Sequence, residues 1–389
     1  MSRDLRADRL KVLPPYLFAE VDRAKREAIQ RGVDVIDLGV GDPDMPTPGP
    51  IVEALREAAG DPACHRYPSY AGWTGLRETF AAYFQRRFGV KLDPGKEVLA
   101  LIGSKEGIAN TPLALLNPGE VALVPEPAYP VYRTSTIFAG GEPWEMPLLE
   151  KNGFFPDLGA IPADVLDRAR LMFINYPNNP TAATASTEQL GRAVEFARKH
   201  EVVICHDAAY AETYFGDPPP SILSVPGGRE VAIEYHSLSK TFSMAGWRIG
   251  FAVGRADALA ALLTLKSNVD SGAFIAVQRA AAVALENAEA LAGPLRERYR
   301  ARLEILAGGL EAAGAPLRRP EATFYLWVRV PKGSNSMGFA KRLLDEAGVV
   351  ATPGVGFGKS GEGFVRMSLT APEERLEVAA ERLSRMRWR

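Results

Sequence analysis

The chain has 389 residues, of which 47% are hydrophobic and 24% charged, and its formal net charge is -1 at pH 7. This balance is typical of a globular protein and argues against a surface for nucleic acid or for a membrane. No apolar run reaches the roughly 18 residues of a membrane span, so we expect a soluble chain, whose length favours two domains.

The cysteines and the first residues indicate the cellular compartment in which we expect the protein. Cys64 and Cys205 show neither metal-ligand spacing nor a disulfide framework, which fits a reducing compartment. The first residues are charged and lead into no secretory apolar segment. We therefore expect a cytoplasmic protein. The four histidines also lack ligand spacing, so no metal is expected.

The N-terminal part is predicted to be mainly helical. Charged and apolar residues fall at helical spacing over 18–31, and a short strand near 35–38 then runs into a Gly/Pro loop. Helices are also expected over 51–59 and 76–88. The aromatic-rich segment 65–73 has no regular period, so it is expected to be a loop at an interface, a ligand wall or part of the core.

From about residue 97 a pattern of strand, loop and helix repeats. The apolar runs that read as strands are 98–102, 121–124, 171–174 and 202–207. Continuous apolar runs are typical of parallel strands that are covered on both faces. The alternation predicts an α/β domain with a mostly parallel sheet, with functional side chains gathered where the strands end.

Past Arg255 the composition becomes rich in alanine and helical. A smaller α+β pattern follows it: a strand at 324–330, a helix at 337–347, strands at 349–352 and 364–369, and a last helix from about 373. We therefore predict three parts. They are an N-terminal arm and helix (1–45), a large domain (46–289) and a small C-terminal α+β domain (290–389).

The segment 237–248 carries the sharpest chemical signal. Lys240 lies among small hydroxyl residues, eight positions before Arg248. Hydroxyls and an arginine suit a phosphate, and a partly desolvated lysine suits a Schiff base with a carbonyl. Pyridoxal 5'-phosphate needs both groups. For this segment alone, a polar turn between two strands is an equal alternative.

Other loops after predicted strands supply the remaining contacts. A helix begins at 103–107, where Ser104 and Lys105 join free backbone N–H groups in a cradle for an anion. Ser237, Ser239 and Arg248 are expected to hold the same phosphate, with the bidentate arginine as the strongest contact.

The ring of that cofactor also finds candidate partners. Asp207 is expected to keep the pyridine nitrogen protonated, which makes the ring an electron sink. Asn179 and Tyr210 are candidates for hydrogen bonds to the ring phenolate oxygen, and Tyr129 offers a face for stacking. Once released, Lys240 is expected to move the proton between the substrate and the cofactor.

The motifs occur in a distinctive order along nearly the whole chain. They are Gly-Ser-Lys-Glu (103–106), Pro-Ala-Tyr-Pro-Val-Tyr (127–132), Tyr-Pro-Asn-Asn-Pro-Thr (176–181), Asp-Ala-Ala-Tyr (207–210), Ser-Leu-Ser-Lys (237–240) and Gly-Trp-Arg-Ile-Gly (246–250). The chain resembles the class I/II aminotransferases of the aspartate aminotransferase fold, which are fold-type I enzymes that use pyridoxal phosphate.

This resemblance implies further roles. Arg366 corresponds to the arginine that binds the substrate α-carboxylate, although a surface arginine is the alternative for that residue alone. Gly41 is expected to meet the same carboxylate through its backbone, and Asn179 is expected to contact the substrate as well as the cofactor. Tyr67 resembles the tyrosine that reaches the phosphate of a neighbouring subunit, which implies a homodimer with shared active sites.

Two features need separate interpretation. The family continues Asn-Pro-Thr with glycine, whereas Ala182 follows here, which matters only if φ is positive at that position. The segment 356–361 matches G-x-G-x-x-G, but it leads into a strand-like run rather than a helix, and Pro353 occupies the position where a P-loop needs glycine. We reject both nucleotide-site interpretations.

The substrate prediction depends on shorter matching segments. A finer resemblance, at 14–18, 39–48 and 266–272, points to the LL-diaminopimelate aminotransferase branch, where Tyr16 and Asn268 are expected to contact an amino-acid or 2-oxo-acid substrate. Aminotransferases for alanine, aspartate or aromatic amino acids share much of the pattern. A pyridoxal-phosphate-dependent carbon–sulfur lyase and a cofactor-binding regulatory module are the alternatives from other classes.

Overall fold

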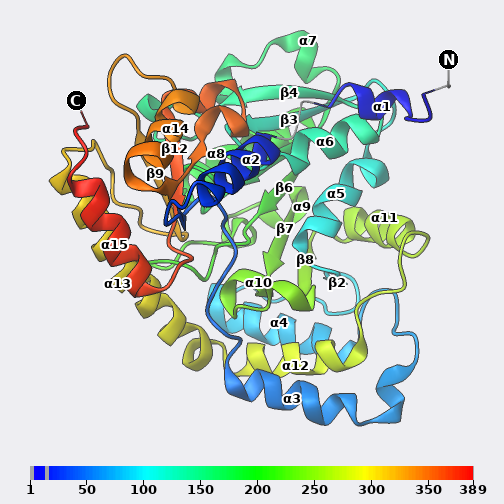
Figure 1. Cartoon of the computed structure of the whole chain (residues 1–389). Helices are drawn as coiled ribbons and strands as arrows, with labels where there is room; N and C mark the ends of the chain where they lie inside the picture. Colours follow the sequence, from blue (N-terminus) through cyan, green and yellow to red (C-terminus); the bar gives the residue numbers. More distant parts are fainter. Residues whose placement is uncertain (1–3, 14–16, 389) are drawn as a thin grey trace.

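A seven-stranded sheet forms the centre of the molecule, with helices on both faces (Figure 1). The computed structural model describes residues 4–13 and 17–388. The strands of this sheet are β2 (Val98–Leu101), β3 (Val121–Glu126), β4 (Glu142–Pro147), β5 (Ala169–Asn175), β6 (Val203–Asp207), β7 (Ala232–Ser237) and β8 (Gly250–Gly254). Their order across the sheet is β2-β8-β7-β6-β5-β3-β4.

The direction of the strands explains where a site can form. Strand β8 is antiparallel to both of its neighbours, whereas the pairs from β7 across to β4 are parallel. Since β2 is also antiparallel to β8, it points the same way as β7. The carboxyl ends of all these strands except β8 therefore lie along one edge, and β8 starts from that edge.

The predicted mostly parallel sheet is confirmed, but the strand that we expected to pair in parallel at 98–102 does not. Among the described strands, β2 pairs only with β8, and the register sets Leu99 opposite Ala252 in an antiparallel ladder. Every residue of β2 is buried. A strand that is covered on both faces has a continuous apolar sequence whether it pairs in parallel or antiparallel. The sequence therefore could not distinguish these two kinds of pairing.

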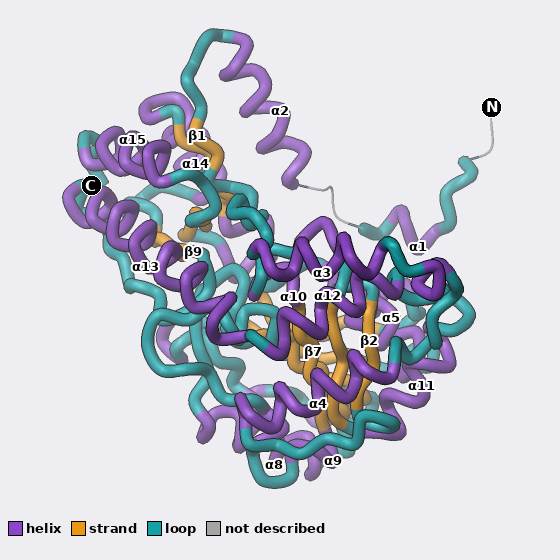
Figure 2. The backbone as a smooth tube through the Cα atoms, turned by 90° about the horizontal axis from the view of Figure 1, so that it is seen from below, coloured by secondary structure: helices purple, strands orange, loops and turns teal. Residues whose placement is uncertain are grey.

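Alternate strand residues pack into two hydrophobic clusters, one on each face of the sheet, which together form the first core. Val98 and Ala100 belong to one cluster with helices α4, α8 and α12, whereas Leu99 and Leu101 belong to another with α5, α6 and α11. Figure 2 shows α3, α4 and α12 in front of the strands. The helices around this sheet are α3 (Gly49–Ala59), α4 (Thr74–Phe88), α5 (Ser104–Leu115), α6 (Val131–Phe138), α7 (Ala163–Leu166), α8 (Thr187–His200), α9 (Gly228–Val231), α10 (Leu238–Thr241), α11 (Ala256–Lys266) and α12 (Ile275–Glu286).

A second core lies beside the first. A three-stranded antiparallel sheet has the order β11-β12-β9, and β1 pairs in parallel with β10. Helix α13 packs on α15 and α14 packs on α2. The elements of this core are α2 (Leu17–Gln30), β1 (Ile36–Asp37), α13 (Ala288–Ala312), β9 (Tyr325–Arg329), α14 (Ser336–Ala347), β10 (Val349–Val350), β11 (Thr352–Pro353), β12 (Phe364–Ser368) and α15 (Glu373–Ser384). Helix α1 (Asp8–Lys11) buries no residue and lies apart from this core (Figure 2).

The structure differs from the sequence interpretation at two strands. The single strand expected at 349–352 is divided between β10 and β11, which pair with different partners. Strand β4 was not predicted, because its two prolines, Pro143 and Pro147, weigh against a strand. Strand β4 lies at the sheet edge, where a missing N–H is tolerated. The domain boundaries at 45/46 and 289/290 stay a prediction.

No helix in the described ranges 4–13 and 17–388 is both long and apolar enough to cross a membrane.

Candidate active site

One group of polar side chains lies where β2 ends and β8 begins; we call Ser104, Ser237, Ser239 and Arg248 the anion end of the site. Gly103 has a φ of +80°, and a Cβ there would lie 2.3 Å from Arg248 Nη2. The guanidinium of Arg248 therefore rests against the start of α5, beside the buried Ser104. A helix N-terminus and a guanidinium together attract an anion.

Buried hydroxyls at the anion end lack partners. Ser237 ends β7, and Ser239 lies in α10 directly after it. Within the described part of the chain, Ser239 Oγ and the nearby Ser243 Oγ are buried without a hydrogen-bond partner. Buried hydroxyls are almost always hydrogen-bonded. These hydroxyls therefore fit a bound group rich in acceptor oxygens, such as a phosphate.

Lys240 lies between the sheet edge and the loop after β1. Its Nζ donates to the Gly41 carbonyl at 3.3 Å. The same ammonium lies 5.6 Å from the centre of the Phe324 ring. The lysine is half-buried. The Lys240 side chain therefore reaches toward the second core, where Gly41 and Phe324 lie. Its ammonium is held there by a long, weak hydrogen bond.

The second group of polar side chains starts at the end of β6; we call Asp207, Tyr132, His206, Glu234 and His236 the carboxylate end. Asp207 Oδ2 accepts a hydrogen bond from Tyr132 Oη at 2.7 Å. Its Oδ1 accepts one from the Ala209 backbone N–H at 3.1 Å. Burial raises the pKa of Asp207, and the bond from Tyr132 opposes that shift. A cationic partner, such as a protonated ring nitrogen, would favour the ionised form.

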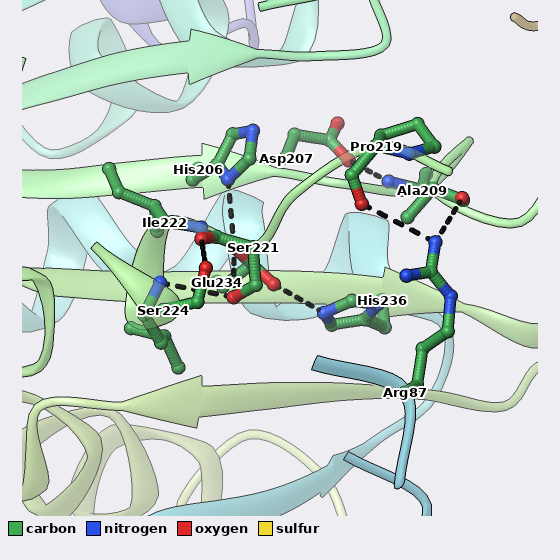
Figure 3. A network of polar contacts seen from close by, with 12 residues as sticks. Arg87, His206, Asp207, Ala209, Pro219, Ser221, Ile222, Ser224, Glu234 and His236 are labelled. Carbon is green, nitrogen blue, oxygen red and sulfur yellow. Dashed lines mark hydrogen bonds and ion pairs between the residues drawn. The ribbon is translucent and has the colours of Figure 1, made fainter. Parts of the chain in front are cut away.

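Behind Asp207, a fully buried Glu234 joins two histidines (Figure 3). Its carboxylate meets His206 Nδ1 at 3.0 Å and His236 Nε2 at 2.7 Å. It also accepts from Ser221 Oγ and from the backbone N–H of Ile222. Burial alone would raise the pKa of Glu234, but the hydrogen bonds from the histidines outweigh it and hold the pKa well below its usual range.

A buried arginine lies on the side of the site that the three-stranded sheet forms. Arg366, in β12, donates through Nη1 to Asn179 Oδ1 at 2.8 Å and through Nη2 to the Gly39 carbonyl at 2.7 Å. Its guanidinium carbon lies 4.2 Å from the centre of the Tyr325 ring and 4.8 Å from that of Phe357. Arg366 is thus a fixed buried cation, and the alternative of a surface arginine is wrong.

Two tyrosines meet beside this arginine. Tyr210 Oη lies 3.0 Å from Tyr325 Oη, and both side chains are buried. A Cβ at Gly41 would lie 1.9 Å from Tyr325 Oη, so only glycine fits there. The loop that contains Gly41 is held from its far side by Arg302, whose two Nη atoms donate to Asp44 at 2.6 and 2.9 Å.

Tyr129 and Lys105 complete the described part of the site. Tyr129 is half-buried in the loop between β3 and α6. Lys105 Nζ lies 5.6 Å from the centre of its ring, a cation–π distance. Lys105, in the first turn of α5, thus adds an exposed positive charge at the start of this helix.

The structure does not join every predicted residue to this group. Tyr67 is 87% exposed. Asn268 is exposed, and its side-chain amide donates to the Thr264 carbonyl at 2.9 Å. Tyr16 lies outside the described residues. The proposed contacts of these three residues stay predictions.

Three residues of the site were not predicted from the sequence. Tyr132 and Tyr325 lay only within a motif and a predicted strand, and Glu234 was not singled out at all. The one signal for Tyr132 was its position at the start of a helix, three residues after Tyr129. Ala182, flagged as a departure, does have a positive φ of +57°. The loop thus keeps the left-handed conformation that glycine suits better, at some cost in strain.

Comparison with known proteins agrees with this geometry. The family model described as "Aminotransferase class I and II" matches residues 33–383. The LL-diaminopimelate aminotransferase of Aquifex aeolicus is 56% identical over 382 residues, which cover 98% of this chain and 99% of that enzyme. The enzyme of the same name from Syntrophobacter fumaroxidans is 55% identical over 383 residues, with 98% and 99% covered.

A solved structure extends the likeness to the fold. A double mutant of Thermus thermophilus aspartate aminotransferase matches with a TM-score of 0.91 and 31% identity, over 99% of this chain and 100% of that one. Enzymes of this family bind pyridoxal 5'-phosphate, and the unpaired hydroxyls, Arg248 and Asp207 fit that cofactor. The chain therefore belongs to the class I and II aminotransferases, as a pyridoxal-phosphate-dependent transaminase of fold type I.

Proposed function

We propose that this transaminase moves an amino group between LL-diaminopimelate and 2-oxoglutarate by a ping-pong mechanism, in lysine biosynthesis. In the biosynthetic direction, glutamate would donate its amino group to the cyclic dicarboxylate tetrahydrodipicolinate. The identity to two LL-diaminopimelate aminotransferases over almost the whole chain supports this substrate. The observation that carries the chemistry is the contact of Lys240, next to Ser239 of the anion end, with the Gly41 carbonyl, in the same loop whose Gly39 carbonyl accepts from Arg366.

Lys240 is the proposed nucleophile and proton carrier. When bound, pyridoxal phosphate supplies an electron sink for the electrons of the substrate Cα–H bond. Lys240 would hold the cofactor through its Nζ, and once the substrate amine has taken that place, the free Nζ would carry the Cα proton. Its hydrogen bond to Gly41 is long and needs only a small movement to break.

The anion end would bind the phosphate. Arg248 would supply a bidentate contact, and Ser104, Ser237 and Ser239 would supply hydroxyls. Lys105 would add a positive charge at the same helix start. The unpaired hydroxyl of Ser239 supports this assignment most directly, because a phosphate oxygen would satisfy it.

The ring would be held from three sides. Asp207 would pair with the ring nitrogen, since a carboxylate whose pKa is raised by burial gains most from a cationic partner. Asn179 and Tyr210 would donate to the ring phenolate oxygen. Tyr129 would cover one ring face.

The substrate would lie against Arg366. Its guanidinium would bind the α-carboxylate, with the Gly41 backbone on the other side. The Nε of Arg366 is buried without a hydrogen-bond partner among the described residues, so the arginine keeps a free donor. Tyr16 and Asn268 would contact the remainder of the substrate.

A homodimer would complete the site. Enzymes of this family are typically dimeric, and Tyr67 would reach the phosphate of the neighbouring subunit. Its 87% exposure in the single chain fits a residue that a partner covers. Tyr70, Trp73 and Phe274, which are also exposed, would extend that interface. We place the enzyme in the cytoplasm, where the two free cysteines stay reduced.

The substrate is tested by offering the purified holoenzyme LL-diaminopimelate and 2-oxoglutarate and measuring the glutamate formed. Aspartate, alanine and phenylalanine serve as competing donors at equal concentration. We expect kcat/KM to be highest for LL-diaminopimelate. A higher value for any competitor would overturn the assignment within the aminotransferases.

The reaction class is tested in the half-reaction without 2-oxoglutarate. Transamination leaves pyridoxamine phosphate on the enzyme, which changes its absorbance. A carbon–sulfur lyase would instead release pyruvate and ammonia from a sulfur amino acid. A Lys240→Ala variant should lose at least about 10²- to 10⁴-fold in turnover, the usual contribution of a positioned proton carrier. Undiminished turnover would refute the mechanism.

A further inference from the structure

Tyr325 lies at the junction of the proposed cofactor and substrate residues. It is the first residue of β9 and is 2% exposed. Its hydroxyl lies 3.0 Å from Tyr210 Oη. Its ring lies under the guanidinium of Arg366, with 4.2 Å between ring centre and guanidinium carbon. Thus one side chain contacts a residue assigned to the cofactor and a residue assigned to the substrate.

The Tyr325 hydroxyl has little freedom to leave this position. The backbone of Gly41 approaches so closely that a Cβ would lie 1.9 Å from Tyr325 Oη. The ring is also wedged against Phe324, with 4.9 Å between ring centres. Arg366 covers its other side. The short distance to Tyr210 is therefore fixed by packing on several sides.

The donor and acceptor roles follow from counting protons. Each tyrosine hydroxyl carries one proton and accepts through its lone pairs. If Tyr210 gives its proton to the ring phenolate oxygen, the contact with Tyr325 can be made only by the Tyr325 proton. Hydrogen bonds in such a chain strengthen one another, because each donor polarises the next hydroxyl.

We propose that Tyr325 is a positioning residue that acts through Tyr210: its hydroxyl donates to Tyr210 Oη and directs the Tyr210 proton at the phenolate oxygen of the cofactor. The proposal rests on the cofactor role assigned to Tyr210, but it does not depend on which amino acid is the substrate. Tyr325 would thereby tune the proton affinity of the cofactor-loaded site before any substrate arrives.

The test is a pH titration of the visible absorbance of the holoenzyme without substrate. Its midpoint is compared among the wild type, Tyr210→Phe, Tyr325→Phe and the double variant. Loss of a donor makes the deprotonated, phenolate-bearing state less favourable, so the Tyr210→Phe midpoint should rise. Tyr325→Phe should raise it by a smaller amount, roughly a few tenths of a unit. In the double variant, Tyr325→Phe should add nothing, because its effect passes through Tyr210.

Tyr299→Phe is the matched control. Tyr299 lies in the same core, 2% exposed and packed on Phe324, and its hydroxyl has no hydrogen-bond partner within the described chain. This variant should leave the midpoint unchanged. Thermal unfolding of each cofactor-free variant checks that the fold is kept, and all these substitutions preserve the ring.

Three outcomes would overturn the proposal. An unchanged midpoint in Tyr325→Phe would remove any coupling to the cofactor. A lower midpoint would mean that Tyr325 accepts the Tyr210 proton and competes with the cofactor. A shift of equal size in the Tyr210→Phe background would show that Tyr325 acts by another route. Failure of the LL-diaminopimelate assay leaves this measurement intact, because no substrate is used.

Discussion

The two ends of the site are built in opposite ways. At the anion end, Ser239 carries a buried hydroxyl without a partner within the described chain, and Arg248 is exposed. At the carboxylate end, Asp207 and Glu234 are buried, and each accepts at least two hydrogen bonds. The anion end keeps a hydrogen-bond donor free for a ligand, whereas the carboxylate end already makes several hydrogen bonds within the chain and leaves only Asp207, among these two carboxylates, to gain from a cationic partner.

This difference predicts a separation between stability and binding. An unsatisfied buried polar group costs free energy, which a ligand can recover. A satisfied buried charge is costly to disturb, because removal of one partner leaves the other uncompensated. Substitutions at the carboxylate end should therefore lower the stability or the chemical rate. Those at the anion end should lower cofactor affinity and leave the cofactor-free protein as stable as before.

The largest effect on stability is expected from Glu234→Gln. The change removes the charged acceptor of His206 and His236, so the free energy of unfolding of the cofactor-free protein should fall by about 3–5 kcal/mol. Urea denaturation measures it. Glu195→Gln, on the exposed face of α8, is the control and should change it by less than about 0.5 kcal/mol. Equal behaviour of the two variants would show that the buried network does not stabilise the fold.

Asp207→Asn should separate the chemical rate from stability. Turnover should fall about 10²- to 10³-fold, the usual effect of losing one preorganised electrostatic contact. Because burial raises the pKa of Asp207, its ionised form is disfavoured in the folded, cofactor-free protein. That cost is present above the raised pKa and disappears as the pH falls through it toward the ordinary value of 3.8.

The cofactor-free Asn variant should therefore be more stable than the wild type at neutral pH, and the gap should close on acidification. Denaturation curves over a pH series measure it. A gap that widens as the pH falls would mean that Asp207 is stabilised, not strained, as a carboxylate.

Arg248→Ala should act on affinity alone. The dissociation constant of pyridoxal phosphate should rise about 10- to 150-fold, which corresponds to about 1.5–3 kcal/mol for a charged hydrogen bond. Fluorescence titration measures it. Unfolding of the cofactor-free protein should change by less than about 0.5 kcal/mol, because the side chain is exposed. Arg248→Lys is the matched variant, which keeps the charge but loses the bidentate geometry. Its dissociation constant for pyridoxal phosphate should lie between those of the wild type and Arg248→Ala.

Ser239→Ala should give the smallest and most telling effect. Cofactor affinity should fall by about 0.5–1.5 kcal/mol, whereas the cofactor-free protein should be equally stable or up to about 1 kcal/mol more stable. Ser186→Ala is the reverse control, because Ser186 caps α8 and its hydroxyl is paired. That variant should lose about 1 kcal/mol of stability and no affinity. If Ser239→Ala destabilised the cofactor-free protein, the Ser239 hydroxyl would have a hydrogen-bond partner in that state, contrary to this interpretation.

Local patterns were enough to predict most of the anion end. Ser104 follows an apolar run and starts a helix, and Ser237, Ser239, Lys240 and Arg248 lie within one short segment. The residues that indicate a phosphate site are close together in the sequence, so predicting it requires no knowledge of long-range contacts. The fold class followed in the same way, because alternating apolar runs and helices specify an α/β sheet whatever the order of its strands.

Ala182 shows where local information stops. The sequence marked it as an unusual residue after Asn-Pro-Thr, but only the backbone gives its φ of +57°. The direction of β2 is a similar case. Its residues are buried on both faces, and burial does not depend on whether the neighbouring strand is parallel.

The sequence by itself therefore determined the α/β class, the proposed lysine and the residues of the anion end, because these depend on short segments. Asp207 and Tyr210 were each predicted singly, but only the tertiary structure decided their partners, Tyr132 and Tyr325. Tyr132 reaches Asp207 across 75 positions, and Tyr210 reaches Tyr325 across 115. No periodicity or spacing encodes such contacts, since the first forms when α6 packs on the seven-stranded sheet and the second forms where the loop after β6 meets β9.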